Sequence, residues 1–296
     1  MSGINLKGGQ LSDPDAFRPG FVRHIAACNN AALPGGRRTL RIGNAVVGWL
    51  SPGIAAAMLE FPEITAATDG LMLQDGGALF GISRALSAAG FHRWRGESFD
   101  VRAVPDGPVL GTIDRGGLPV FGVAAEGVHV NGLVERANGL HLWVGRRARD
   151  KALDPGKLDH IVAGGIPAGL GPIETLIKEA AEEAAIPPET ASSAVPVGIV
   201  SYAMERPEGL RRDRLHCFDL MLPASFVPRP NDGEVEAFEL WPMSRAMAAV
   251  RDTDLFKFNV NLVLIDLFLR TGAITGAEAQ AVRQAMTAVS LPAEQR

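Results

Sequence analysis

The 296-residue sequence has few cysteines and no basic excess, and each shortage excludes a class of protein. Its two cysteines, Cys28 and Cys217, lack metal-ligand spacing, so we expect no disulfide framework, no cysteine metal site and a reducing compartment. The formal net charge of −4 argues against a dedicated nucleic-acid surface, which needs an excess of lysine and arginine. We therefore expect no nucleic-acid partner.

The sequence also lacks segments that direct a chain into or across a membrane. Residues 1–10 have neither the basic nor the apolar region of a signal peptide. The most apolar stretch, residues 260–269, contains Asn261 and Asp266 and is too short to span a bilayer. These absences predict a cytoplasmic protein without a membrane partner.

The residues that are present favour a mixed α/β protein with a sizeable core, since 47% are hydrophobic and 21% are charged. Residues 40–50 are typical of a strand pair with a turn at Gly43-Asn44, and two short helices are predicted at 52–59 and 82–89. The turn-rich residues 114–117 suggest a boundary between an N-terminal domain (1–117) and a second domain (118–296).

The second part has clearer periodic patterns. Asn138-Gly139 predicts a hairpin, because both residues tolerate positive φ and strand-like residues stand on either side. The predicted strands are 127–135, 140–147, 197–204, 214–222 and 234–241. The predicted helices are 172–185, 260–270 and 275–289, and residues 151–171 are expected to be mostly loop.

The helix predicted at 172–185 carries the most informative side chains. Its apolar residues share one face that should contact a sheet, whereas Glu179, Glu182 and Glu183 lie within an arc of roughly 100° on another side. Three neighbouring carboxylates repel one another unless a cation lies among them, and such oxygen ligands suit Mg²⁺ or Mn²⁺. Gly164 and Gly165 precede this helix and would allow close backbone approach of a phosphate.

This segment resembles the Nudix box: Gly, five residues, Glu, seven residues, Arg-Glu, an apolar residue, any residue, Glu-Glu, any residue, Gly, and an apolar residue. The positions that match are Gly164, Glu179, Glu182, Glu183 and Ile186. The positions that depart from it are Leu170 for the first glutamate, Lys178 for arginine and Ala185 for the late glycine. Glu174 is expected to stabilise the helix N-terminus rather than replace the missing glutamate.

Spaced motifs over roughly residues 40–275 are similar to one Nudix branch, whose members include proteins fused to thiamine pyrophosphokinase. The motifs that carry this resemblance are Trp143, Arg146-Arg147, residues 155–159, residues 163–169, residues 232–236 and residues 256–259. The resemblance implies an α/β/α sandwich with a mixed sheet, a smaller N-terminal α/β domain and C-terminal helices. It also implies Mg²⁺-dependent cleavage of thiamine diphosphate, or its oxy and oxo analogues, to the monophosphate.

Further site residues follow as hypotheses. Glu234 starts a predicted strand after a flexible turn, so we expect its carboxylate to position or deprotonate the attacking water, with Glu236 as a weaker alternative. Arg146, Arg147 and Lys151 are expected to bind the terminal phosphate. Trp143 or Trp94 could stack on a cationic ring, although tryptophans such as these are more often core or domain-interface residues.

Three functions remain open at this stage. The first is a diphosphatase acting on a small thiamine-type substrate, and the second cleaves a nucleoside diphosphate derivative with the same chemistry. The third is a non-catalytic ligand sensor, which the departures at Leu170 and Lys178 would favour. The complete glutamate trio favours catalysis, and the sequence leaves open whether the protein forms a homodimer.

Overall fold

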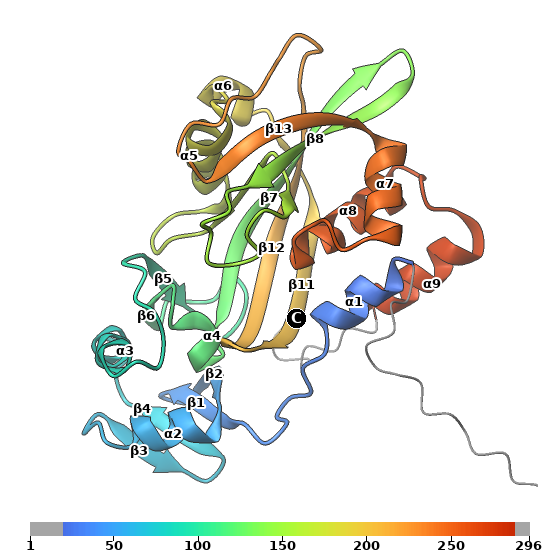
Figure 1. The fold of residues 1–296 in the computed structure, drawn as a ribbon. Coiled ribbons are helices and arrows are strands. Elements are labelled where there is room, and N and C mark those ends of the chain that lie inside the picture. The colour runs from blue at the N-terminus through green and yellow to red at the C-terminus, as the bar shows by residue number, and fades with distance from the viewer. Residues whose placement is uncertain (1–19, 288–296) are drawn as a thin grey trace, which may run out of the picture.

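The largest element of the molecule is a seven-stranded mixed sheet, shown in Figure 1 for a computed structural model that describes residues 20–287. Five strands follow the order β11-β12-β7-β8-β13, while β10 pairs with β7 and β9 with β8. The strands are β7 (Ala124–Arg136), β8 (Gly139–Arg147), β9 (Leu158–Asp159), β10 (Val162–Gly165), β11 (Val195–Arg206), β12 (Gly209–Met221) and β13 (Val235–Pro242). Only β7 and β12 pair in parallel, which makes the sheet mixed.

Helices cover both faces of this sheet (Figure 1). One face meets α5 (Pro172–Ala184), with α6 (Pro188–Ala191) packed beside α5. Four of the other helices lie over the opposite face, namely α1 (Val22–Cys28), α7 (Met243–Asp252), α8 (Phe258–Arg270) and α9 (Gly276–Thr287). Three of them are in contact with the sheet, and the fourth, α9, is in contact with α1. Side chains alternate between the two cores along a strand, so Trp143 faces α5 whereas Leu142 and Val144 face α8. The expected α/β/α sandwich with C-terminal helices is therefore confirmed.

A smaller α/β portion precedes the large sheet and has its own apolar core, which runs from Leu40 to Val123. Its strands are β1 (Arg38–Ile42), β2 (Ala45–Leu50), β3 (Ile64–Ala67), β4 (Gly70–Leu73), β5 (Ser98–Val101) and β6 (Gly111–Asp114). Its helices are α2 (Pro52–Met58), α3 (Ala78–Ala88) and α4 (Leu118–Phe121). This core includes α4, while α1 contacts α8 and α9 instead. The division into 1–117 and 118–296 stays a prediction.

The two predicted hairpins are confirmed. β1 and β2 turn at Gly43, where φ is +56°, and β7 and β8 turn at Gly139, where φ is +105°. The helices expected at 52–59, 172–185 and 260–270 are present with ends shifted by at most two residues. The loop expected at 151–171 contains the short strands β9 and β10, which pair with β8 and β7, and this pairing outweighs the two glycines that end β10.

Two predictions concern residues outside the described range, namely the N-terminal residues 1–10 and the last part of the helix expected at 275–289. Within residues 20–287, none of the helices has the length and apolar character needed to cross a membrane.

Candidate metal and phosphate site

The loop between β10 and α5 brings backbone and glutamate side chains together. Gly164 and Gly165 pair with Val128 and Gly127 of β7, which fixes this loop against the edge of the large sheet. Pro172 begins α5, and the Glu174 carboxylate accepts a hydrogen bond of 2.7 Å from the Gly171 N–H. Glu174 therefore satisfies a free N–H at the helix start, as expected for a residue of the first turn.

The three glutamates of α5 differ in exposure. Glu183 is buried, with 7% of its surface exposed, and its carboxylate accepts a hydrogen bond of 2.9 Å from the Ala163 N–H. Burial raises the pKa of Glu183 well above its usual range, and the charges of Asp159, Glu179 and Glu234 add to that rise. The Glu179 side chain is 15% exposed and that of Glu182 is 49% exposed. One buried and one half-buried carboxylate would both be stabilised by a nearby cation.

Gly164 leaves room for Glu179. A Cβ atom at position 164 would lie 2.5 Å from both Cγ and Cδ of Glu179 and 2.7 Å from its Oε2. These distances are well inside van der Waals contact, so a side chain at position 164 would displace the glutamate. A glycine at this position of the motif is therefore required for two reasons. It leaves room for the Glu179 side chain, and it allows a ligand to approach the backbone closely.

Lys178 supplies the positive charge nearest to these carboxylates. Its ammonium donates to Glu182 at 2.7 Å and to Glu179 at 3.2 Å. The hydrogen bond to Glu182, followed by that to Glu179, raises the pKa of Lys178. Burial raises the pKa of Glu179, and this lysine opposes that rise. Lys178 therefore lies where two carboxylates attract a cation.

The donor set fits Mg²⁺ or Mn²⁺ chemically, because it consists of carboxylate oxygens on consecutive turns of one helix. In the described part of the chain, however, a different group of side chains lies closer together. One possible ligand atom each of His129, Asp159 and His160 lies within 4.8 Å of the other two. Oxygen atoms of Glu179, Glu182 and Glu183 therefore do not gather that closely in the structure.

A cleft of about 590 Å³ opens beside Gly164 and Gly165. Of the described residues that line it, nine are basic and six are acidic, although the whole chain is acidic. Arg147, Lys151 and Glu234 are among them, so with Gly164 and Gly165 the structure brings five predicted site residues to one cavity. The charge of Arg115 acts on both Glu179 and Glu234, which places the α5 glutamates and the cleft in one electrostatic neighbourhood. An excess of positive charge favours a phosphate-bearing ligand.

Glu234 forms an ion pair with Lys151 in this cleft. Burial tends to raise the pKa of Glu234, but the hydrogen bond and charge of Lys151 outweigh it and hold the pKa below its usual value. A carboxylate stabilised in this way is a weaker base, so the geometry favours positioning of a water molecule over its deprotonation. Glu236 instead accepts from the Arg149 N–H at 3.2 Å.

Two predicted substrate-binding residues lie away from the cleft lining. Trp143 is 7% exposed and belongs to the core between α5 and the sheet, because its place in β8 directs it to that face. This corrects the expected stacking role, which requires an accessible ring. Arg146 points to the opposite face from its neighbour Arg147 and lies 3.7 Å from Glu239.

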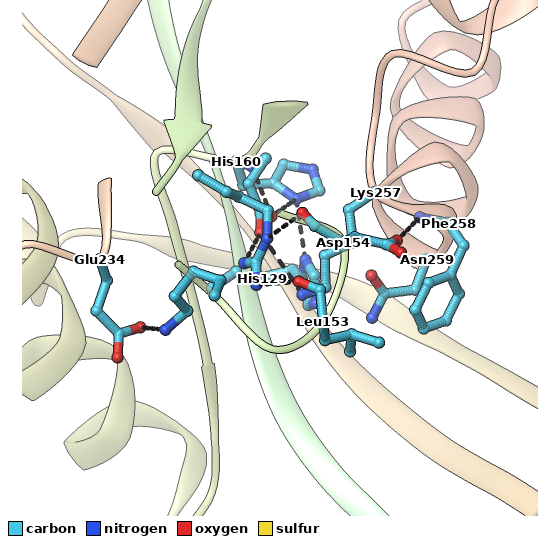
Figure 2. A network of polar contacts seen from close by, with 12 residues as sticks. His129, Leu153, Asp154, His160, Glu234, Lys257, Phe258 and Asn259 are labelled. Carbon is cyan, nitrogen blue, oxygen red and sulfur yellow. Dashed lines mark hydrogen bonds and ion pairs between the residues drawn. The ribbon is translucent and has the colours of Figure 1, made fainter. Parts of the chain in front are cut away.

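Sequence reasoning missed a buried polar network beneath the cleft, which Figure 2 shows. Asp159 accepts hydrogen bonds from Arg147 Nη1 at 2.7 Å and from the His160 N–H at 2.9 Å, and lies 3.5 Å from Lys257 Nζ. His129 and His160 contact each other through their Nδ1 atoms at 2.9 Å. The adjacent Asp159-His160 pair and Lys257 were visible signals, but only the fold shows that they meet.

This network is poorly suited to a metal ion. Asp159 already contacts two cations, and the two histidine Nδ1 atoms are occupied by one hydrogen bond. Burial lowers the pKa of His160 to about 4 and holds that of His129 well below its usual value, so both rings favour the neutral form, which by itself does not exclude a metal ion. A dication would meet the repulsion of Arg147 and Lys257.

Comparison with known proteins supports the Nudix hydrolase family. Nudix hydrolase 20, chloroplastic, of Arabidopsis thaliana is 43% identical over 180 residues, which are 61% of this chain and 48% of that protein. Nudix hydrolase 24, chloroplastic, of the same plant is 43% identical over 180 residues, 61% of this chain and 49% of that protein. The chain thus spans about half the length of these curated relatives. No protein-family model matches it.

Among solved structures, the NUDIX domain of Shewanella oneidensis NrtR complexed with ADP ribose aligns with 50% of this chain and 89% of that domain. Its sequence identity is 13% and its TM-score is 0.41. The relatives' names do not confirm the branch fused to thiamine pyrophosphokinase, and their chloroplastic location leaves the cytoplasmic expectation a prediction.

Proposed function

We propose that this protein is a Mg²⁺-dependent Nudix hydrolase that cleaves thiamine diphosphate, or its oxy or oxo analogues, to the monophosphate and phosphate. One observation carries the chemistry: Glu179, Glu182 and Glu183 share the helix α5, and the strand that precedes this helix, β10, lines a basic cleft. The substrate class rests on the sequence resemblance described above. Mn²⁺ is an alternative ion for the same oxygen ligands.

Each residue has a defined part in this proposal. Glu179, Glu182 and Glu183 would hold the ion, which would supply positive charge beside the diphosphate oxygens and make a nearby water more acidic. Arg147 and Lys151 bind phosphate oxygens, and backbone at Gly164 and Gly165 allows the diphosphate to approach closely. Glu234 orients the attacking water, whose oxygen bonds to phosphorus while the bridging P–O bond breaks.

The organic part of the substrate has a candidate place next to the cleft. A second cavity of about 350 Å³ shares Phe99 and Glu126 with it. Glu126 accepts a hydrogen bond of 2.6 Å from His216, and a carboxylate there suits a ring that carries positive charge. Phe99 lies against Gly165, where an added Cβ would be 2.6 Å from the ring.

The decisive experiment pairs substitutions with a substrate panel. Purified protein is incubated with Mg²⁺ and thiamine diphosphate, its oxy and oxo analogues, ADP-ribose or nucleoside triphosphates, and the products are identified by mass. Glu182→Gln and Glu183→Gln should each lower turnover strongly, because glutamine keeps the shape but loses the charge. Glu189→Gln is the matched control, since Glu189 is an exposed glutamate on α6.

The outcomes separate the alternatives. Near-normal turnover in Glu183→Gln would refute the metal assignment. Turnover of nucleotide compounds alone would keep the mechanism and replace the substrate class. Binding without turnover of any compound would indicate the sensor function and direct attention to Leu170.

A further inference from the structure

Lys257 is a cation at the floor of the cleft that the proposed reaction does not yet use. It directly precedes α8, and its backbone N–H donates to the Leu158 carbonyl at 2.9 Å, which pins this turn to β9. Its side chain is 12% exposed and is among those that line the cleft. A lysine held this deep loses most of its hydration, so its charge needs a partner.

The partner it has is shared. Asp159 lies 3.5 Å from Lys257 Nζ, but the same carboxylate oxygen accepts the shorter 2.7 Å bond from Arg147. Asp159 lies behind the cleft wall, whereas Lys257 and Arg147 both line the cavity. Lys257 and Arg147 thus carry two positive charges at the cavity wall, and the single negative charge of Asp159 leaves a surplus of positive charge there.

The other polar groups around Lys257 do not balance this surplus. Asp154 accepts a bond from the Phe258 N–H at 3.3 Å and pairs with Arg206 at 3.6 Å, so its charge is already opposed. His129 has a lowered pKa because of burial and the Asn259 amide carries no charge, so neither group opposes the positive charge of Lys257. The arrangement therefore has an unmet need for an anionic oxygen.

We infer that Lys257, together with Arg147, forms a subsite that binds a phosphoryl group of the diphosphate substrate. This inference rests on the proposed function. An ammonium group has three donors, and the contact with Asp159 uses one direction and leaves the others for the ligand. Asp159 acts as a positioning residue that fixes both cations, and hydrogen bonds from charged donors to phosphate are among the strong ones.

The test measures binding of inorganic pyrophosphate by calorimetry and, separately, turnover of the substrate panel. Lys257→Met removes the charge and keeps the side-chain length. It should weaken pyrophosphate binding by about tenfold or more, the effect of losing one charged hydrogen bond. Lys257→Arg should restore part of the affinity. Lys157→Met is the matched control, because Lys157 does not line the cleft.

Unchanged pyrophosphate affinity in Lys257→Met, or absence of binding by the wild type, would overturn the inference. Loss of binding in a protein that hydrolyses no diphosphate would leave the subsite standing and refute the function. Full turnover with an unchanged KM in Lys257→Met would leave the proposed function standing and refute the subsite. If Lys257→Met does not fold, the ¹H–¹⁵N signal of the Lys257 ammonium in the wild type decides: it should shift with pyrophosphate, and a fixed signal excludes contact.

Discussion

Replacing Gly164 by alanine should separate catalysis from stability. The new Cβ would lie 2.5 Å from Cγ and Cδ of Glu179, whereas carbon atoms in contact are normally about 3.5 Å apart or more. The Glu179 carboxylate must therefore retreat by roughly 1 Å. A shift of that size in a catalytic group lowers turnover on the order of 100-fold.

Stability should change little in the same variant. The clashing atoms belong to a flexible side chain that is 15% exposed and can rotate, so we expect a loss of no more than about 1–3 kcal/mol, the usual range for overpacking. Urea unfolding measures this free energy, and initial rates with Mg²⁺ and the diphosphate substrate measure turnover.

Gly81→Ala is the matched control. An added Cβ at this α3 position meets nothing within 4 Å, so turnover should be unchanged and the helix should gain about 1 kcal/mol. If Gly164→Ala turns over substrate as fast as the wild type, the present position of the Glu179 carboxylate is not required for catalysis. A much larger loss of stability would indicate a structural role for Gly164 instead.

Three further predictions follow from buried groups. Asp114 is fully buried and accepts hydrogen bonds from the backbone N–H groups of residues 95–97 and 116. Asp114→Ala should therefore lower the free energy of unfolding by roughly 1–3 kcal/mol for each donor left unsatisfied, measured as a lower urea midpoint. An unchanged midpoint would contradict this prediction. Burial lowers the pKa values of His129 and His160 in the folded protein, so the unfolded chain takes up protons first as the pH falls below about 6.5, and the free energy of unfolding decreases. For His160 this decrease continues to about pH 4 and amounts to ~3 kcal/mol. Urea midpoints that stay constant from pH 7.5 to 4 would refute this prediction. Trp143→Phe should lower stability by roughly 1–3 kcal/mol and leave KM unchanged, because the ring lies in the core; a raised KM at constant stability would restore the stacking role.

The positions of single elements were largely predictable, because they depend on local patterns. Asn138-Gly139 ties two strands together over a few residues, and the apolar stripe of α5 fixes which side faces the sheet. The three glutamates also share a helix face by spacing alone. Short strands such as β9 and β10 were not predictable, since their stability comes from partners far along the chain.

The sequence by itself determined the mixed α/β class, the glutamate cluster and the glycine loop that precedes it. Only the tertiary structure decided that Trp143 faces the core while its strand neighbours face the other side, because a shift of one residue along a strand reverses the face. It also decided that Lys257, Asp159 and Arg147 meet under one cleft. Those residues come from different strands and turns, and the distances between them are set by how the sheet and α8 pack.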